Sequence, residues 1–200
     1  HYMIGGLKTD LDGRTSIPGL WAVGECASSG LHGANRMGSN SLLEGLVIGH
    51  RCGQVISPTP IDHSWRPQKS PPNSDNVRLN LTDLIYSMKS LMWRHAGVER
   101  DAAGLAAASE QLTYWSEVTD ELSPATPQAW ELRNMLLIAR AIVMSAATRQ
   151  ESRGAQYRTD FPAMNDAATH TELRVQRDAG GRGQLICERI ATTHTAGAGV

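Results

Sequence analysis

The chain lacks several features that would mark its class at once. Its 200 residues contain three cysteines at wide spacing and no CxxC pair, which argues against a disulfide framework or a metal site and is typical of a reducing compartment. No apolar run approaches the ~20 residues that a membrane-spanning helix needs. The formal net charge of -1 gives no sign of a nucleic-acid partner. These absences favour a cytoplasmic protein.

The most informative stretch is HGANRMGSNSLLEGLVIG, residues 32–49, where a small-residue loop runs into an apolar helix. Leucines and valine recur at helical spacing after Ser39, Asn40 and Ser41, so we expect the helix to begin near these candidate N-caps. A helix N-terminus favours negative charge, and the planar guanidinium of Arg36 can bind a carboxylate or phosphate with two parallel hydrogen bonds. The pattern predicts an anion site; a capped core helix with a solvated arginine is the alternative.

The segment before this loop predicts a strand that ends beside it. Turn signals at Asp12-Gly13 and Pro18-Gly19 precede the apolar run Leu20–Val23, which we interpret as a buried strand that delivers Glu25. A carboxylate at the end of a buried strand, before a glycine-rich loop and a helix, is typical of sheets that bind a ribose or ribitol hydroxyl. A glutamate that merely faces water is the other interpretation.

The rest of the chain predicts a proline-rich linker over 57–79 and then an all-α region. Three amphipathic helices are expected, the first capped by Asn80 or Thr82, the second from about Asp101, and the third capped by Thr126 with Pro127 as its first residue. Short connections between them favour an antiparallel bundle. The expected core positions of the three helices are Leu81, Leu84, Ile85, Met88, Leu91 and Met92; Leu105, Leu112, Trp115, Val118 and Leu122; and Leu132, Met135, Leu136, Ala139, Ile142, Val143 and Ala146.

Two features follow the helices. Charged residues crowd the stretch 149–160 around Gly154, and we favour an ion-paired latch over a solvated face, with a secondary anion-binding role left open. The runs ELRVQR and QLICERI flank a glycine-rich turn that ends at Gly183 and predict a two-stranded hairpin. The small, polar tail from Thr192 is expected to fray.

Three motifs resemble, in order and spacing, the FAD-containing succinate dehydrogenase and fumarate reductase flavoprotein family. They are HYMIGG at 1–6, PGLWAVGE at 18–25 and HGANRMGSNSLLEG at 32–45, and the stretch 131–162 is similar to the helical tail of that family. The residues Gly30-Leu31-His32 and Leu43-Glu44, near the two ends of the third motif, resemble the branch that oxidises L-aspartate. The resemblance implies an α/β plus all-α fold: the C-terminal part of a Rossmann-like FAD-binding domain at 1–56, the linker at 57–79, a three-helix bundle at 80–152 and a tail with a hairpin at 153–200.

The resemblance also implies roles for single residues. His1 and Arg36 match groups that bind a substrate carboxylate, and Ser39 matches a nearby polar contact. Glu25 matches a residue that hydrogen-bonds the flavin ribitol. The remaining cofactor contacts match Asn40, Ser41 and Leu42, whose helix start would stabilise reduced flavin. Where members of the family usually carry a histidine in the charged stretch, this chain has Gln156, so a role for that position is in doubt.

By the same resemblance, L-aspartate is oxidised to iminoaspartate for quinolinate and NAD synthesis, oxygen or fumarate reoxidises the flavin, and quinolinate synthase takes the product. The chain begins at His1 and offers no strand followed by GxGxxG. We therefore expect a C-terminal fragment without a complete catalytic set or turnover of its own. Two alternatives stay open: a succinate dehydrogenase or fumarate reductase flavoprotein subunit, and a non-enzymatic helical module without flavin.

Overall fold

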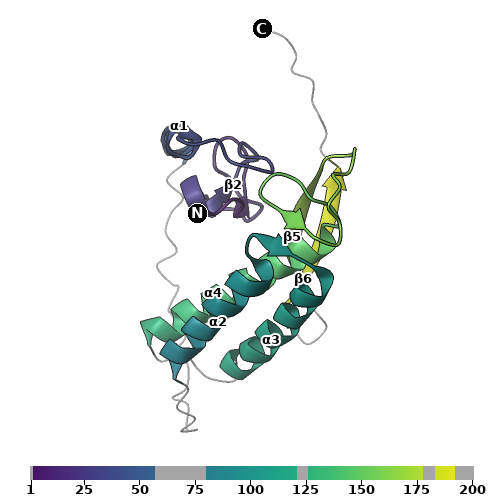
Figure 1. The fold of residues 1–200 in the computed structure, drawn as a ribbon. Helices are drawn as coiled ribbons and strands as arrows, with labels where there is room; N and C mark the ends of the chain where they lie inside the picture. Colours follow the sequence, from purple (N-terminus) through teal and green to yellow (C-terminus); the bar gives the residue numbers. More distant parts are fainter. Residues whose placement is uncertain (1, 57–79, 121–125, 178–182, 192–200) are drawn as a thin grey trace. The chain divides into compact units, whose positions relative to one another are not determined.

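The computed structural model describes residues 2–56, 80–120, 126–177 and 183–191. The chain divides into two compact units, residues 1–68 and 69–200, each with its own packing (Figure 1). His1, the expected linker at 57–79, most of the glycine-rich turn and the tail from Thr192 lie outside the described residues. Among the helices that are described, none is both long and apolar enough to cross a membrane.

The first unit is built around helix α1, Asn40–Val55, which begins where the sequence predicted. Strand β1, Leu7–Lys8, pairs in parallel with β2, Ala27–Ser28, and a short 3₁₀ helix η1, Gly24–Cys26, lies just before β2. Ser39 is the N-cap of α1, but its side chain makes no capping hydrogen bond. Its backbone has φ 70°, in the left-handed region, whereas capping side chains normally work from an extended backbone.

The predicted buried strand Leu20–Val23 is wrong. Trp21 forms a single antiparallel bridge with Arg14, and Leu20 is exposed. The two turn signals stand too close together for a strand: the Thr15 N–H donates to the Leu20 carbonyl across 3.1 Å and closes a short, irregular hairpin. The chain then turns at Gly24, where φ is 76°. As a consequence, Glu25 lies exposed on η1 instead of at a strand end.

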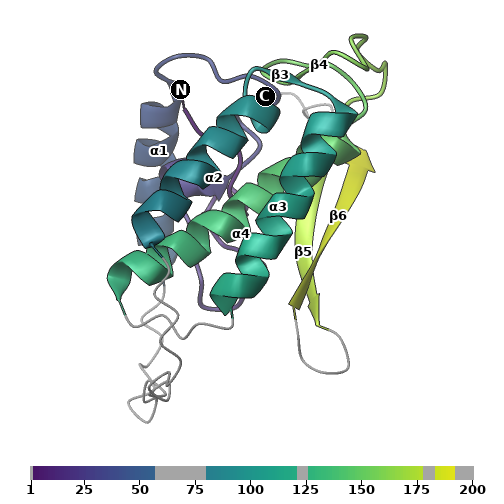
Figure 2. The ribbon, with the colours of Figure 1, turned by 60° about the horizontal axis from the view of Figure 1, so that its bottom comes forward.

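In its described residues the second unit has three helices, α2 (Leu81–Ala96), α3 (Ala102–Asp120) and α4 (Pro127–Thr148), packed side by side (Figure 2). The predicted caps are confirmed, because Asn80 accepts from the Asp83 N–H and Thr126 accepts from the Ala129 N–H. The shared core is made of alanines, leucines, one valine and one methionine: Met88, Ala96, Leu105, Ala108, Leu112, Leu132, Leu136, Ala139, Val143 and Ala146.

Some details of this packing differ from expectation. Val118 is only partly buried, while Ser116 and Thr119 are buried in its place and donate to carbonyls of their own helix at Leu112 and Trp115. A hydroxyl that bonds one turn back along its helix can be buried without an unmatched donor. Hydrophobicity alone therefore pointed to the wrong residue on this face.

The helices are joined to a β-region at one end of the unit. Strands β5, Thr169–Arg177, and β6, Gly183–Ala191, pair antiparallel and contact α4. A second, unexpected pairing joins β3, Glu99–Arg100, in parallel with β4, Tyr157–Arg158. Two-residue strands leave no periodicity to detect in a sequence. This pairing brings the connection after α2 beside the charged latch.

Candidate functional site

The start of α1 is the best candidate for a binding site in the first unit. Arg36, on the loop before the helix, donates through Nη1 to the Ser41 hydroxyl at 2.7 Å. Its guanidinium carbon lies 4.2 Å from the centroid of the Tyr2 ring, within the range of a cation–π contact. Among the described residues, Nε and Nη2 of Arg36 have no hydrogen-bond partner. The arginine is therefore held at one edge, with donors left over.

The first turn of α1 has one unused backbone donor. The N–H groups of Asn40, Leu42 and Leu43 donate to the carbonyls of Met37 and Ser39, whereas within the described residues the N–H of Ser41 donates to none. Of the three residues that the resemblance implies as cofactor contacts, Asn40, Ser41 and Leu42, Ser41 is thus the one whose backbone N–H has no partner within the described residues. A free amide at the positive end of a sixteen-residue helix still attracts an anion or a carbonyl oxygen.

Glu25 is brought to the same helix by close packing. A Cβ at Gly45 would lie 3.9 Å from the Gly24 Cα, and a Cβ at Gly49 would lie 3.6 Å from Val23 Cγ1. A methyl group at either position would make only an ordinary van der Waals contact, so this face of α1 lies close to η1 and to the residue before it. Glu25 makes no hydrogen bond within the described residues, so its carboxylate is exposed and available. His1, the remaining sequence-predicted substrate ligand, is outside the described part of the chain.

Sequence reasoning missed a buried polar cluster behind Arg36. Glu44 accepts a short hydrogen bond from the Ser29 hydroxyl, and its Oε2 lies 2.9 Å from His32 Nε2 in an ion-pair contact without hydrogen-bond alignment. The side chains of Glu44 and His32 are 3% and 10% exposed. The Tyr2 ring meets His32 edge to face at 6.0 Å. A glutamate five residues into an amphipathic helix signals nothing by itself, so only the fold reveals this cluster.

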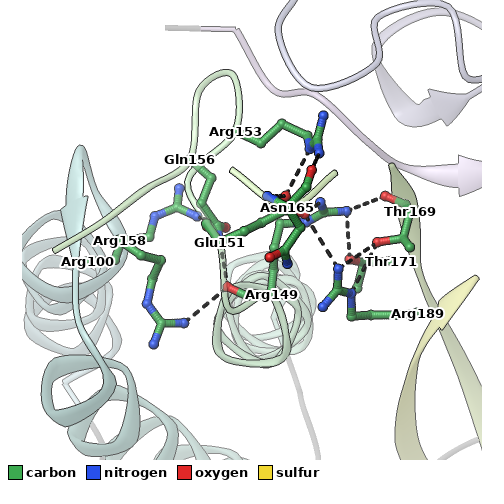
Figure 3. A network of polar contacts seen from close by, with 10 residues as sticks. All are labelled: Arg100, Arg149, Glu151, Arg153, Gln156, Arg158, Asn165, Thr169, Thr171 and Arg189. Carbon is green, nitrogen blue, oxygen red and sulfur yellow. Dashed lines mark hydrogen bonds and ion pairs between the residues drawn. The ribbon is translucent and has the colours of Figure 1, made fainter. Parts of the chain in front are cut away.

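The predicted latch of the second unit is confirmed as a network of ion pairs (Figure 3). The fully buried carboxylate of Glu151 lies 2.5 Å from Arg149 Nη1, 3.0 Å from Arg153 Nε and 3.6 Å from Arg189 Nη2. It also accepts from the Asn165 N–H. Burial raises the pKa of the Glu151 carboxyl, but the Asn165 amide and the arginines outweigh burial and leave that pKa below its usual value.

Arg158 is almost as deeply buried as Glu151, at 1% exposure. Its Nε and Nη2 donate to both oxygens of Asp160, and its Nη1 donates to the Ala146 carbonyl at the end of α4. Hydrogen bonds from Arg158 hold the pKa of Asp160 at about 2. A cation at a helix C-terminus satisfies carbonyls that the helix leaves unpaired. This arginine therefore ties β4 to α4.

Gln156 joins the latch to β3. It accepts from Arg100 Nη1 at 2.9 Å and donates to the Arg149 carbonyl at 3.0 Å. Burial, followed by the charge of Arg158, lowers the pKa of the Arg100 guanidinium. A neutral amide can serve a donor and an acceptor at once without adding charge among these arginines. The geometry of Gln156 is that of a structural bridge.

Comparison with known proteins agrees with this division of the chain. Residues 86–196 match the family model described as the fumarate reductase flavoprotein C-terminal region, and residues 1–42 match that of an FAD binding domain. The chain therefore belongs to the fumarate reductase and succinate dehydrogenase flavoprotein family.

Particular relatives fall in more than one branch of that family. The chain is 40% identical over 177 residues to an L-aspartate oxidase of Rhodospirillum rubrum, across 85% of this chain and 59% of the relative. It is 35% identical over 212 residues to a fumarate reductase flavoprotein subunit of Mycobacterium tuberculosis, across 90% of this chain and 36% of the relative.

A solved structure is similar as well. The Mycobacterium smegmatis Sdh1 complex in the apo form aligns with a TM-score of 0.76 and 26% identity, over 96% of this chain and 36% of that one. The chain thus spans between 36% and 59% of the length of these three proteins.

Proposed function

We propose that the chain is part of an FAD-dependent enzyme that oxidises L-aspartate to iminoaspartate. The observation that carries this proposal is the start of α1, where, among the described residues, two guanidinium nitrogens of Arg36 and one helix amide have no hydrogen-bond partner. Seven relatives named L-aspartate oxidase, at 35% to 40% identity, support this choice of substrate. We further propose that the enzyme works in the cytoplasm and that its product passes to quinolinate synthase.

The donors at α1 suit the flavin part of FAD. The pyrimidine edge of a flavin carries carbonyl oxygens, which the free Ser41 N–H and the positive end of α1 can accommodate. Glu25, exposed on the adjoining η1, is an acceptor for a ribitol hydroxyl, and we place Asn40 and Leu42 at the same edge. When bound, FAD supplies the acceptor for the hydride of the substrate. The fixed dipole of α1 favours the negative charge that reduction adds.

Arg36 is the proposed substrate ligand. Its free Nε and Nη2 form the planar fork that matches both oxygens of a carboxylate. The Ser41 hydroxyl and the Tyr2 ring hold the guanidinium in one orientation, so little side-chain freedom is lost when a ligand binds. We propose that Ser39 supplies a polar contact beside it and that His1 binds the second carboxylate. The arginine thus orients the substrate and takes no part in proton transfer.

The domain arrangement belongs to the same proposal. We assign residues 1–56 to the C-terminal part of the FAD-binding domain, 57–79 to a linker, 80–152 to a helical bundle and 153–200 to a tail with a hairpin. Among the described residues of the second unit, the buried charges are all matched by ion pairs or hydrogen bonds. We therefore assign it a structural role and no chemistry.

A second candidate is a flavoprotein subunit that interconverts succinate and fumarate. The similarity to the Mycobacterium tuberculosis relative and to the Sdh1 complex favours this candidate. Under either proposal, Arg36 would bind a dicarboxylate. Succinate differs from aspartate in lacking the amino group. The described contacts of Arg36 concern a carboxylate, which both substrates have. The choice between the two substrates therefore depends on the relatives.

Flavin reduction separates these candidates. The protein, expressed from its complete gene, is purified and examined for visible flavin absorbance, whose absence would exclude both enzymes. It is then mixed without oxygen with L-aspartate or with succinate. Bleaching of the flavin by L-aspartate alone is the expected result. Bleaching by succinate alone would establish the second candidate, and no bleaching by either dicarboxylate would refute both.

A further inference from the structure

The cluster behind Arg36 has no role in the proposed reaction, yet it is continuous with that arginine. Tyr2 lies under the guanidinium, His32 meets the edge of the Tyr2 ring, and Glu44 faces His32. Ser29 ends the chain of contacts by donating to Glu44. The cluster therefore links the loop that carries Arg36 to the second turn of α1, beside the helix start that Arg36 also contacts.

The burial of this cluster calls for an explanation. A buried carboxylate is costly unless it is paired, and among the described residues only His32 and Ser29 reach the carboxylate of Glu44. Buried Nδ1 of His32 has no hydrogen-bond partner in the described part of the chain. An apolar pair of similar size would fill this space at lower cost. The polar pair is therefore better explained by what it positions than by stability.

We propose that His32 and Glu44 are positioning residues that hold the Tyr2 ring against Arg36 and thereby fix the carboxylate-binding fork. The inference rests on the proposed function, because it assumes that Arg36 binds a dicarboxylate.

The contacts explain how this positioning works. Ser41 fixes one nitrogen of Arg36 within the guanidinium plane, while the Tyr2 ring fixes the position of that plane from its face. Loss of the face contact lets the guanidinium rotate about its single hydrogen bond. Because bidentate binding depends on the orientation of the guanidinium, we expect such rotation to weaken the binding of a dicarboxylate about tenfold.

The test measures fumarate binding to the oxidised, flavin-loaded protein expressed from its complete gene, through the change in flavin absorbance. His32→Gln and Glu44→Gln should each raise the Kd about tenfold. His50→Gln, at an exposed position of α1, is the control and should leave the Kd unchanged. In an Arg36→Lys background the same two substitutions should add less than about twofold, because positions that act through one residue are not additive. Equal effects in both backgrounds, or an unchanged Kd with a lower Tm, would overturn the proposal.

Two substitutions of Tyr2 test the same role without changing the buried His32–Glu44 pair. Tyr2→Phe keeps the ring face and should bind fumarate as the unmodified protein does, while Tyr2→Leu should lose about tenfold. Equal affinities for Tyr2→Phe and Tyr2→Leu would contradict the positioning role.

A readout without ligand separates this inference from the proposed function. The ¹⁵N NMR signal of Arg36 Nε should move in His32→Gln and stay in place in His50→Gln. If the signal moves but the unmodified protein binds no dicarboxylate, the proposed function fails and the positioning holds. If fumarate binds and the signal stays in place, the positioning fails alone.

Discussion

Arg36 in the first unit and Arg158 in the second are both held by neighbouring side chains, but they use their donors in opposite ways. All three guanidinium nitrogens of Arg158 donate, to Asp160 and to carbonyls at the end of α4, and the residue is 1% exposed. Arg36 donates through one nitrogen to Ser41 and is only partly buried. The difference separates a structural cation from the arginine that we propose binds a ligand: satisfied donors stabilise the fold, whereas donors without a partner among the described residues can serve a ligand.

The largest expected effect is on stability, from removing the satisfied arginine. Arg158→Met should lower the free energy of unfolding by about 3 kcal/mol, because it leaves the carbonyls of α4 and the carboxylate of Asp160 without their buried cation. Urea unfolding measures the change. Arg174→Met is the matched control, since Arg174 pairs with Glu188 in the open and should cost less than about 0.5 kcal/mol. If the two variants lost the same free energy of unfolding, the buried contacts of Arg158 would not be what stabilises the fold.

The next effect is on binding, from changing the arginine with free donors. Arg36→Lys should weaken dicarboxylate binding by about 2 kcal/mol, roughly thirtyfold in Kd, because a point charge replaces a planar fork. Fumarate titration of the flavin-loaded protein measures this, and the Tm should hardly change. Arg51→Lys, on the exposed part of α1 where Arg51 pairs with Asp12, should leave the Kd unaltered. An unchanged Kd in Arg36→Lys would exclude Arg36 from the site.

A smaller effect is expected at the strained cap beside Arg36. Ser39→Gly should raise the free energy of unfolding by about 1 kcal/mol, because glycine adopts the left-handed backbone without the penalty that a Cβ brings. Thermal unfolding measures the gain. Ser90→Gly, inside helix α2, should instead lose about 1 kcal/mol. If the Ser39 variant is also less stable, the left-handed conformation is not under strain in the protein.

The last expected effect is a pH dependence confined to the acid range, and it concerns Asp160. Its pKa in the folded protein is about 2, below the ordinary value of 3.8, so the Asp160–Arg158 pair stabilises the fold above pH 3.8. This contribution is lost as the pH falls from 3.8 through about 2. Urea unfolding across that range should show a steeper loss in the unmodified protein than in Asp160→Asn. Parallel pH profiles for the two proteins would show that the pair carries no such linkage.

Local patterns predicted the parts of the fold that depend on neighbouring residues. The caps at Asn80 and Thr126, the start of α1 and the two hairpin strands follow from side chains within a few positions of each other. The prediction at Leu20–Val23 failed because two close turn signals outweighed a short apolar run. The pairing of β3 with β4 left no pattern to detect, since each strand has two residues separated from the other by the length of two helices.

The candidate site divides in the same way. The sequence by itself determined that Arg36 precedes the helix start and that the stretch 149–160 is rich in charge, because both are properties of adjacent residues. Only the tertiary structure decided which donors are used, since a guanidinium is satisfied by groups that the fold brings to it. Arg158 meets the end of α4 and Arg36 meets Tyr2, and within the described part of the chain these contacts use every nitrogen of Arg158 but leave two of Arg36 for the ligand that we propose.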